Sequence, residues 1–253
     1  MLAAFLQGEL FGYFLVFARL GAAIMLLPGF GEGFVSPRIR ILLALAITFA
    51  VMPLVADGLP PLPGDILGLV VILFGEILIG LFIGTLARIL LGALQSAGAL
   101  VANFTNLSAA QVFDPSAAGM TTLPGSFLNL MALVLIFATN LHHVMLAALV
   151  DSYGAFPAGT APPLEDFAES ASRLVADGFA LALQLSAPLL VVTMIMQIGL
   201  GLLARLMPQM QVFFVAMPLQ ILLGLAVFAV TLAAVMRWYL DRFAEPFAMF
   251  APG

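Results

Sequence analysis

The chain has 253 residues, of which 64% are hydrophobic and only 8% are charged, whereas roughly 25% of the residues in an ordinary soluble domain are charged. Its positive side chains are eight arginines and no lysine, and its net charge is -5, which excludes a basic nucleic-acid-binding surface as its main feature. The absence of cysteine excludes disulfides, thiolate catalysis and Cys-ligated metal. A mean hydropathy of +1.20 predicts an all-α integral membrane protein.

Apolar segments separated by helix-breaking residues follow one another along the whole chain, and they predict kinked membrane helices. No polar interval between them is long enough for a soluble domain, so we expect a single membrane domain over residues 1–253. Asp65 and Asp177 precede two of the segments, where a carboxylate can accept hydrogen bonds from the first amides of a helix. The six predicted helices lie near residues 10–28, 41–56, 66–105, 123–150, 178–204 and 212–236.

The third segment, 66–105, is too long for one ordinary membrane crossing. It is either one strongly tilted helix or two helices that turn near Arg88. Arginines in the 32–40 loop and after residue 236 favour a cytoplasmic location for both regions. That arrangement needs an even number of crossings between them, which favours two helices and a periplasmic N-terminus.

Four residues recur at every fourth position within this segment: Glu76, Gly80, Gly84 and Arg88. They lie along one ridge of a helix, with two glycines between opposite charges. Glycine at this spacing lets another helix approach closely, and charges in an apolar helix normally face protein or water. The ridge predicts either ordinary helix packing or a contact face for another subunit.

The interval 101–126 combines small polar residues with apolar ones between two strongly apolar helices. It is either a surface loop or a segment buried in a cavity, because irregular backbone at membrane depth needs protein or water around it. The mixed composition favours a buried re-entrant segment or plug. Asp114-Pro115 predicts a rigid bend, and the candidate plug residues are Phe104, Asn106, Phe113, Asp114, Pro115 and Met120.

Residues 204–220, ARLMPQMQVFFVAMPLQ, contain a helix end and a following helix start. Pro208 removes a backbone donor and stops the preceding helix, and Pro218 predicts a kink one turn into the next. With Arg205 and Gln209, these prolines are candidates for a fixed turn. No sequence motif of a hydrolase, a nucleotide-binding loop or a zinc protease occurs in the chain, so we expect no enzyme activity and no cofactor or metal.

The run RLMPQMQVFFVAMPL at 205–219 resembles a signature of the FliR family of flagellar and virulence-type type III secretion proteins. Other runs agree in order: FARLG at 17–21, PGFGE at 28–32, PRIRI at 37–41, GEILIGLFIG at 75–84 and FDP at 113–115. The resemblance covers residues 5–248. It departs from the family pattern in a 106–122 loop rich in Ala and Ser and in an acidic 151–177 interval without a known motif.

The resemblance implies a subunit of a helical export gate in the flagellar basal body of the bacterial inner membrane, multi-pass by hydropathy. It implies FliP-like and FliQ-like membrane partners, FlhB-like and FlhA-like export components, unfolded export substrates and no nucleic acid. It also implies that the loop at 106–122 plugs the closed pore. The alternatives are the equivalent subunit of a virulence-type secretion system, a small-solute secondary transporter and a purely structural membrane subunit.

Overall fold

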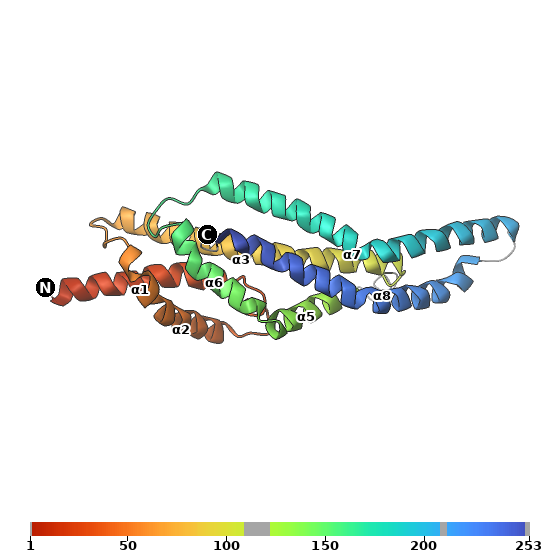
Figure 1. Cartoon of the computed structure of the whole chain (residues 1–253), viewed down its shortest axis with the longest axis horizontal. Helices are drawn as coiled ribbons and strands as arrows, with labels where there is room; N and C mark the ends of the chain where they lie inside the picture. The colour runs from red at the N-terminus through yellow and green to blue at the C-terminus, as the bar shows by residue number, and fades with distance from the viewer. Residues whose placement is uncertain (1, 109–121, 208–211, 251–253) are drawn as a thin grey trace. The chain divides into compact units, whose positions relative to one another are not determined.

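The computed structural model describes residues 2–108, 122–207 and 212–250, and these residues form helices and connecting loops. The predicted all-α membrane class is confirmed, since long apolar helices make up most of the described chain. In chain order the elements are α1 Leu2–Ile24, α2 Pro37–Val55, η1 Ala56–Gly58, α3 Ile66–Phe104, α5 Leu123–Ala138, α6 Leu141–Ala155, α7 Leu164–Leu206, α8 Val212–Ala244 and η2 Glu245–Phe250 (Figure 1).

Short polar residues begin two of these helices. Ser36 precedes α2 and its hydroxyl accepts a hydrogen bond from the amide of Ile39 at 3.5 Å, while Pro37 occupies the first helical position, where its missing donor does no harm. The Asp65 carboxylate accepts from the amide of Gly68 at 2.9 Å, so the prediction that Asp65 caps the third helix is confirmed. The same prediction for Asp177 is wrong, because Asp177 lies inside α7.

The helix α3 runs without a break through Arg88 for 39 residues. At about 1.5 Å per residue it is about 58 Å long, roughly twice the thickness of a bilayer's hydrocarbon core. The expected turn near Arg88 is therefore absent. The prediction of a periplasmic N-terminus depended on counting residues 66–105 as two membrane crossings. A single continuous helix removes the support for that count.

The predicted helix near 123–150 is two helices in the structure. The helices α5 and α6 meet at an angle of 74°, and Asn140 between them has a left-handed backbone with φ 61°. Asparagine adopts this conformation more readily than other non-glycine residues. The polar residues at the bend, Thr139, Asn140, His142 and His143, are few within a long apolar run, so the predicted helix continued across them.

Helix α7 begins at Leu164, well before the predicted start at 178. Its first turn carries Glu165 and Asp166, which favour the positive end of a helix, and Glu169 pairs with Arg173 one turn later. A polar helical turn of this kind has no hydropathy signal. The acidic interval 151–177 is therefore partly helical.

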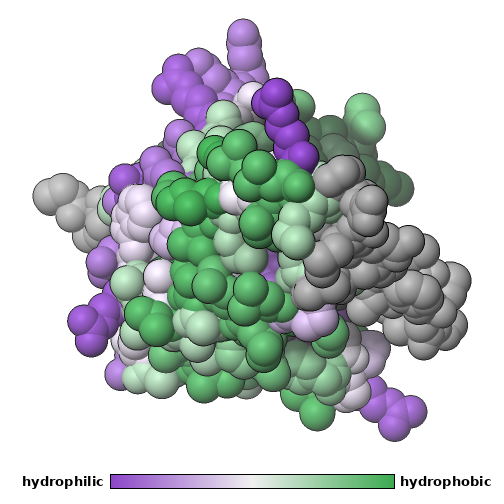
Figure 2. Space-filling model, turned by 90° about the vertical axis from the view of Figure 1, so that its right-hand side faces the viewer, coloured by the Kyte–Doolittle hydropathy of each residue, from purple (hydrophilic) through white to green (hydrophobic). Residues whose placement is uncertain are grey.

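Four helical stretches of the described chain are long and apolar enough to cross a membrane: Pro37–Gly58, Ile66–Phe104, Leu164–Leu206 and Ala216–Phe250, and the bent pair α5–α6 makes a fifth candidate. Many of their large apolar side chains are exposed, such as Val230 on α8 at 83%. Figure 2 shows one face on which hydrophobic residues gather while hydrophilic ones lie mostly toward its margins. Surfaces of this kind require lipid or protein around them.

The chain divides into two compact units, each built from separate stretches of sequence. The first contains Met1–Ile89, Ile136–Leu174 and Phe243–Gly253, and the second contains Leu90–Leu135 and Val175–Arg242. Within the first unit α1 packs on α2, and α6 packs on η2. Each unit contains side-chain contacts between residues that are distant in sequence.

Candidate functional site

The glycine ridge of α3 lies against α1 in the first unit. A Cβ atom at Gly80 would overlap the backbone carbonyl oxygen of Arg19, and one at Gly84 would lie 2.9 Å from the carbonyl oxygen of Ala23. Only glycine therefore allows the two helix backbones to come this close. The helix that these glycines admit is α1 of the same chain, and a contact with another subunit along this ridge stays a prediction.

This close approach places Arg19 of α1 beside Glu76 of α3. Arg19 Nε donates to Glu76 Oε2 at 2.6 Å, and Nη2 donates to Oε1 at 3.1 Å. The two side chains are 0% and 1% exposed. A two-bond arginine–carboxylate pair of this geometry is among the strongest polar contacts in proteins, and burial makes each partner depend on the other.

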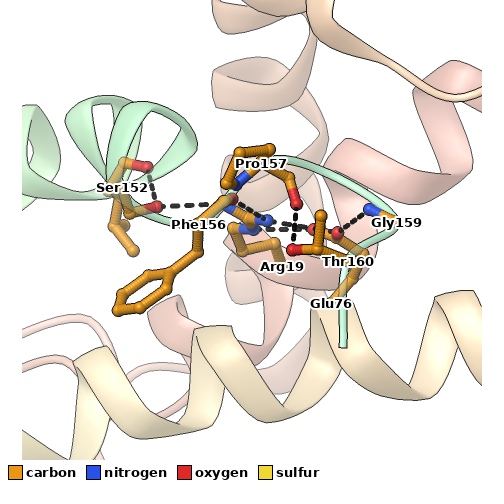
Figure 3. A network of polar contacts seen from close by, with 8 residues as sticks. Arg19, Glu76, Ser152, Phe156, Pro157, Gly159 and Thr160 are labelled. Atoms are coloured by element: carbon orange, nitrogen blue, oxygen red, sulfur yellow. Dashed lines mark hydrogen bonds and ion pairs between the residues drawn. The ribbon is translucent and has the colours of Figure 1, made fainter. Parts of the chain in front are cut away.

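Residues 152–160, which comprise the last turn of α6 and the start of the connection to α7, complete the junction, as Figure 3 shows. Arg19 Nη1 donates to Ser152 Oγ at 3.2 Å, Nη2 donates to the backbone oxygen of Phe156 at 2.9 Å, and the Gly159 amide donates to Glu76 Oε1 at 3.1 Å. The guanidinium carbon also lies 3.9 Å from the ring centre of Tyr153, a cation–π geometry. Both charges are therefore surrounded by partners from this one segment.

Gly159 is suited to its place for two reasons. Its φ is +79°, which L side chains rarely adopt, and a Cβ there would lie 2.8 Å from Cγ of Pro60. The sharp turn at Gly159 aims its amide at the Glu76 carboxylate. The junction thus ties α1, α3 and residues 152–160 together, and its two opposite charges lie against each other.

The other end of the ridge has a separate partner. Arg88 Nη1 donates to Glu32 Oε1 at 3.1 Å, with side chains 47% and 16% exposed. Arg40 holds the same loop, since its Nη2 donates to the Glu32 backbone oxygen at 2.5 Å and its Nε to that of Val35 at 3.1 Å. The charges at 76 and 88 therefore secure two different segments.

The second unit has its junction where α3 ends. The backbone oxygen of Phe104 accepts a hydrogen bond from Thr193 Oγ1 of α7 at 3.2 Å. Asn106 Nδ2 donates to Gln220 Oε1 of α8 at 2.6 Å. Two of the predicted plug residues thus join the end of α3 to the following long helices.

The remaining predicted residues are placed as follows. Phe113, Asp114, Pro115 and Met120 lie outside the described residues, as do Pro208 and Gln209. Arg205 is exposed in the last turn of α7, and Pro218 is exposed inside α8. The proposed plug and turn therefore stay predictions.

Sequence reasoning missed Arg19, the 152–160 segment and Gln220. A charge within an apolar helix requires a partner, and this rule marks both Arg19 and Glu76. It does not pair them, because 57 positions separate the two residues. Ser152, Gly159 and Gln220 have no individual signal, since short polar residues and glycines occur throughout the chain.

Comparison with known proteins gives one consistent family. Residues 10–245 match the model of a family described as bacterial export proteins, family 1. The flagellar biosynthetic protein FliR of Caulobacter vibrioides is 40% identical over 93% of this chain and 94% of its own length. FliR of Escherichia coli is 28% identical over 94% of this chain and 91% of its own length. The Yop proteins translocation protein T of Yersinia pestis is 30% identical over 87% of this chain and 85% of its own length. This chain belongs to bacterial export protein family 1.

Proposed function

We propose that the chain is a subunit of the flagellar type III protein export gate and forms part of the channel through which unfolded flagellar proteins cross the bacterial inner membrane. One observation carries this proposal. The similarity to proteins named for flagellar biosynthesis extends over nearly the whole chain rather than a single segment. The chain is accordingly a type III export component with multiple membrane helices.

The helices themselves support a role inside an assembly. Both α3 and α7, with 39 and 43 residues, are much longer than the roughly 20 residues that cross a bilayer core. Their apolar side chains are exposed along much of this length, as at Phe74 and Ile198. Protein partners that cover these surfaces would stabilise the chain, and we propose FliP-like and FliQ-like subunits together with FlhA-like and FlhB-like export components.

We further propose that residues 106–122 act as a plug in the resting gate. Support comes from their mixed composition and from the junction at Phe104 and Asn106, which anchors the start of this stretch to α7 and α8. A channel for unfolded chains needs a constriction that closes without binding one sequence tightly, and apolar side chains supply this by packing and dewetting. Deleting residues 106–120 is expected to make the assembled complex conduct small ions without substrate. Complexes with the deletion that are no more conductive than the parent would reject the plug.

The role in flagellar export is tested by deleting the gene in its host and supplying it again from a plasmid. We expect the deletion to abolish motility and secretion of filament protein, and the plasmid to restore both. The same plasmid with an early stop codon in the gene is the matched control, and it should restore neither. Normal motility in the deletion strain would contradict the proposal.

A virulence-type secretion role is the second candidate, because a Yersinia translocation protein is 30% identical over most of the chain. The same deletion strain separates the two roles. Loss of secreted effector proteins with intact motility would favour the virulence role, whereas loss of motility with intact effector secretion would favour the flagellar role.

A further inference from the structure

Backbone amides and two threonine hydroxyls, those of Thr105 and Thr193, satisfy carbonyl groups at the C-terminal end of α3. Asn106 has a left-handed φ of 58°, its amide donates to the oxygen of Asn103 at 3.3 Å, and the Ser108 amide donates to the oxygen of Ala102 at 3.2 Å. A left-handed residue after a helix is a common way to end it, and asparagine tolerates this conformation. The side chain of Asn106 is therefore not needed as a cap.

That side chain reaches across to α8 instead. Asn106 Nδ2 donates to Gln220 Oε1 at 2.6 Å. Gln220 is only 6% exposed, and its buried Nε2 has no partner within the part of the chain that the structure describes. Turning both amides by 180° exchanges donor and acceptor and still leaves one Gln220 atom unpaired. An unpaired buried amide is unfavourable. If packing were the only role of position 220, an apolar residue would therefore fit better there than glutamine.

Two further contacts make the junction sensitive to sliding. Thr105 is 0% exposed, and its methyl group occupies the space beside Gly224 of α8, where a Cβ would overlap it. A change of register by one residue moves each position of α8 by about 1.5 Å along the helix axis and by about 100° around it. That motion would turn the Gln220 side chain away from Asn106 and break their hydrogen bond. The same shift would move Gly224 away from Thr105.

We propose that Asn106 and Gln220 are a positioning pair that fixes the lengthwise register of α8 against the end of α3, and that protein export requires this register. The inference rests on the proposed function. Asn106 lies where the chain leaves α3 toward the 106–122 stretch. The register therefore determines which part of α8 lies beside the start of that stretch. The amide pair holds this point without a charge, which suits an apolar environment.

A double-mutant cycle on export tests the pair, with Asn106→Gly, Gln220→Met and the double variant. Glycine keeps the left-handed backbone, and methionine keeps the volume of glutamine, so each change removes mainly the hydrogen bond. We expect each single variant to lower the secretion rate about fivefold, the factor that corresponds to a hydrogen bond of about 1 kcal/mol. The double variant should equal the singles, while recovery of the membrane complex stays at the parent level.

Thr231→Val is the matched control on α8, because the Thr231 hydroxyl bonds within its own helix, to the oxygens of Val227 and Phe228. It should secrete like the parent. Parent-level secretion by Gln220→Met, additive losses in the double variant, or losses that follow complex recovery would overturn the inference. If the parent chain itself supports no export, the proposed function fails, and the same cycle measured on melting temperature then decides whether the two residues are coupled at all.

Discussion

Removing Arg19 is the most informative perturbation of the first unit. Arg19→Ala eliminates the four hydrogen bonds that this side chain donates, two to Glu76, one to Ser152 and one to Phe156. It leaves the Glu76 carboxylate, 1% exposed, with the Gly159 amide as its remaining partner from this network. Removing one partner of a buried ion pair costs about 3–5 kcal/mol, which lowers the melting temperature by on the order of 10 °C for a chain of this size.

Related variants separate charge from geometry. Arg19→Lys keeps the charge but lacks the planar guanidinium fork that bonds both Glu76 oxygens and also reaches Ser152 and Phe156, so we expect an intermediate loss. Arg19→Met with Glu76→Met removes both charges and should cost less than Arg19→Ala, because no buried charge is left unpaired. Exchanging the two residues should not restore stability, since a carboxylate would then face the Phe156 oxygen and a guanidinium the Gly159 amide.

The detergent-purified proteins are heated to a series of temperatures, and the monodisperse peak that remains in size-exclusion chromatography gives the melting temperature of each variant. An Arg19→Ala protein that melts with the parent would refute the reasoning. So would a double methionine variant whose loss equals the sum of the losses of Arg19→Met and Glu76→Met.

Three other predictions follow from single positions. Gly80→Leu should strongly reduce recovery of the assembled complex, because the new side chain would collide with the α1 backbone. Gly92→Leu should be recovered like the parent, since a Cβ at Gly92 would meet no atom within 4 Å. Equal recovery of the two variants would count against the packing role of the ridge. Asn140 has a φ of 61°, a left-handed conformation that glycine adopts freely and branched side chains disfavour. Asn140→Gly should therefore leave the stability of the protein unchanged, and Asn140→Val should lower it by about 1–2 kcal/mol. Equal melting temperatures of the two variants would contradict this prediction. Pro208→Ala and Arg205→Ala should impair assembly or export, and full motility with either variant would argue against a fixed turn.

The sequence was sufficient for the class of the fold and for most helices, because runs without charge have few alternatives to membrane helices. It was also sufficient for the ridge at Gly80 and Gly84, since a four-residue spacing is local information. It was insufficient for the Asn140 bend, where a few polar residues interrupt a long apolar run, and for the polar start of α7, which has no hydropathy signal. It could not pair Glu76 with Arg19 or Asn106 with Gln220, because such contacts depend on which distant helices pack together.

The most direct test of the account is purification of the tagged chain from its native membrane in mild detergent, followed by identification of the proteins that remain bound. An export-gate subunit whose long apolar helices are covered by partners should copurify with FliP-like and FliQ-like membrane proteins in a stable complex. The chain would contradict the proposed role as an export-gate subunit if it were purified from motile cells alone, stable and monodisperse, with neither protein bound.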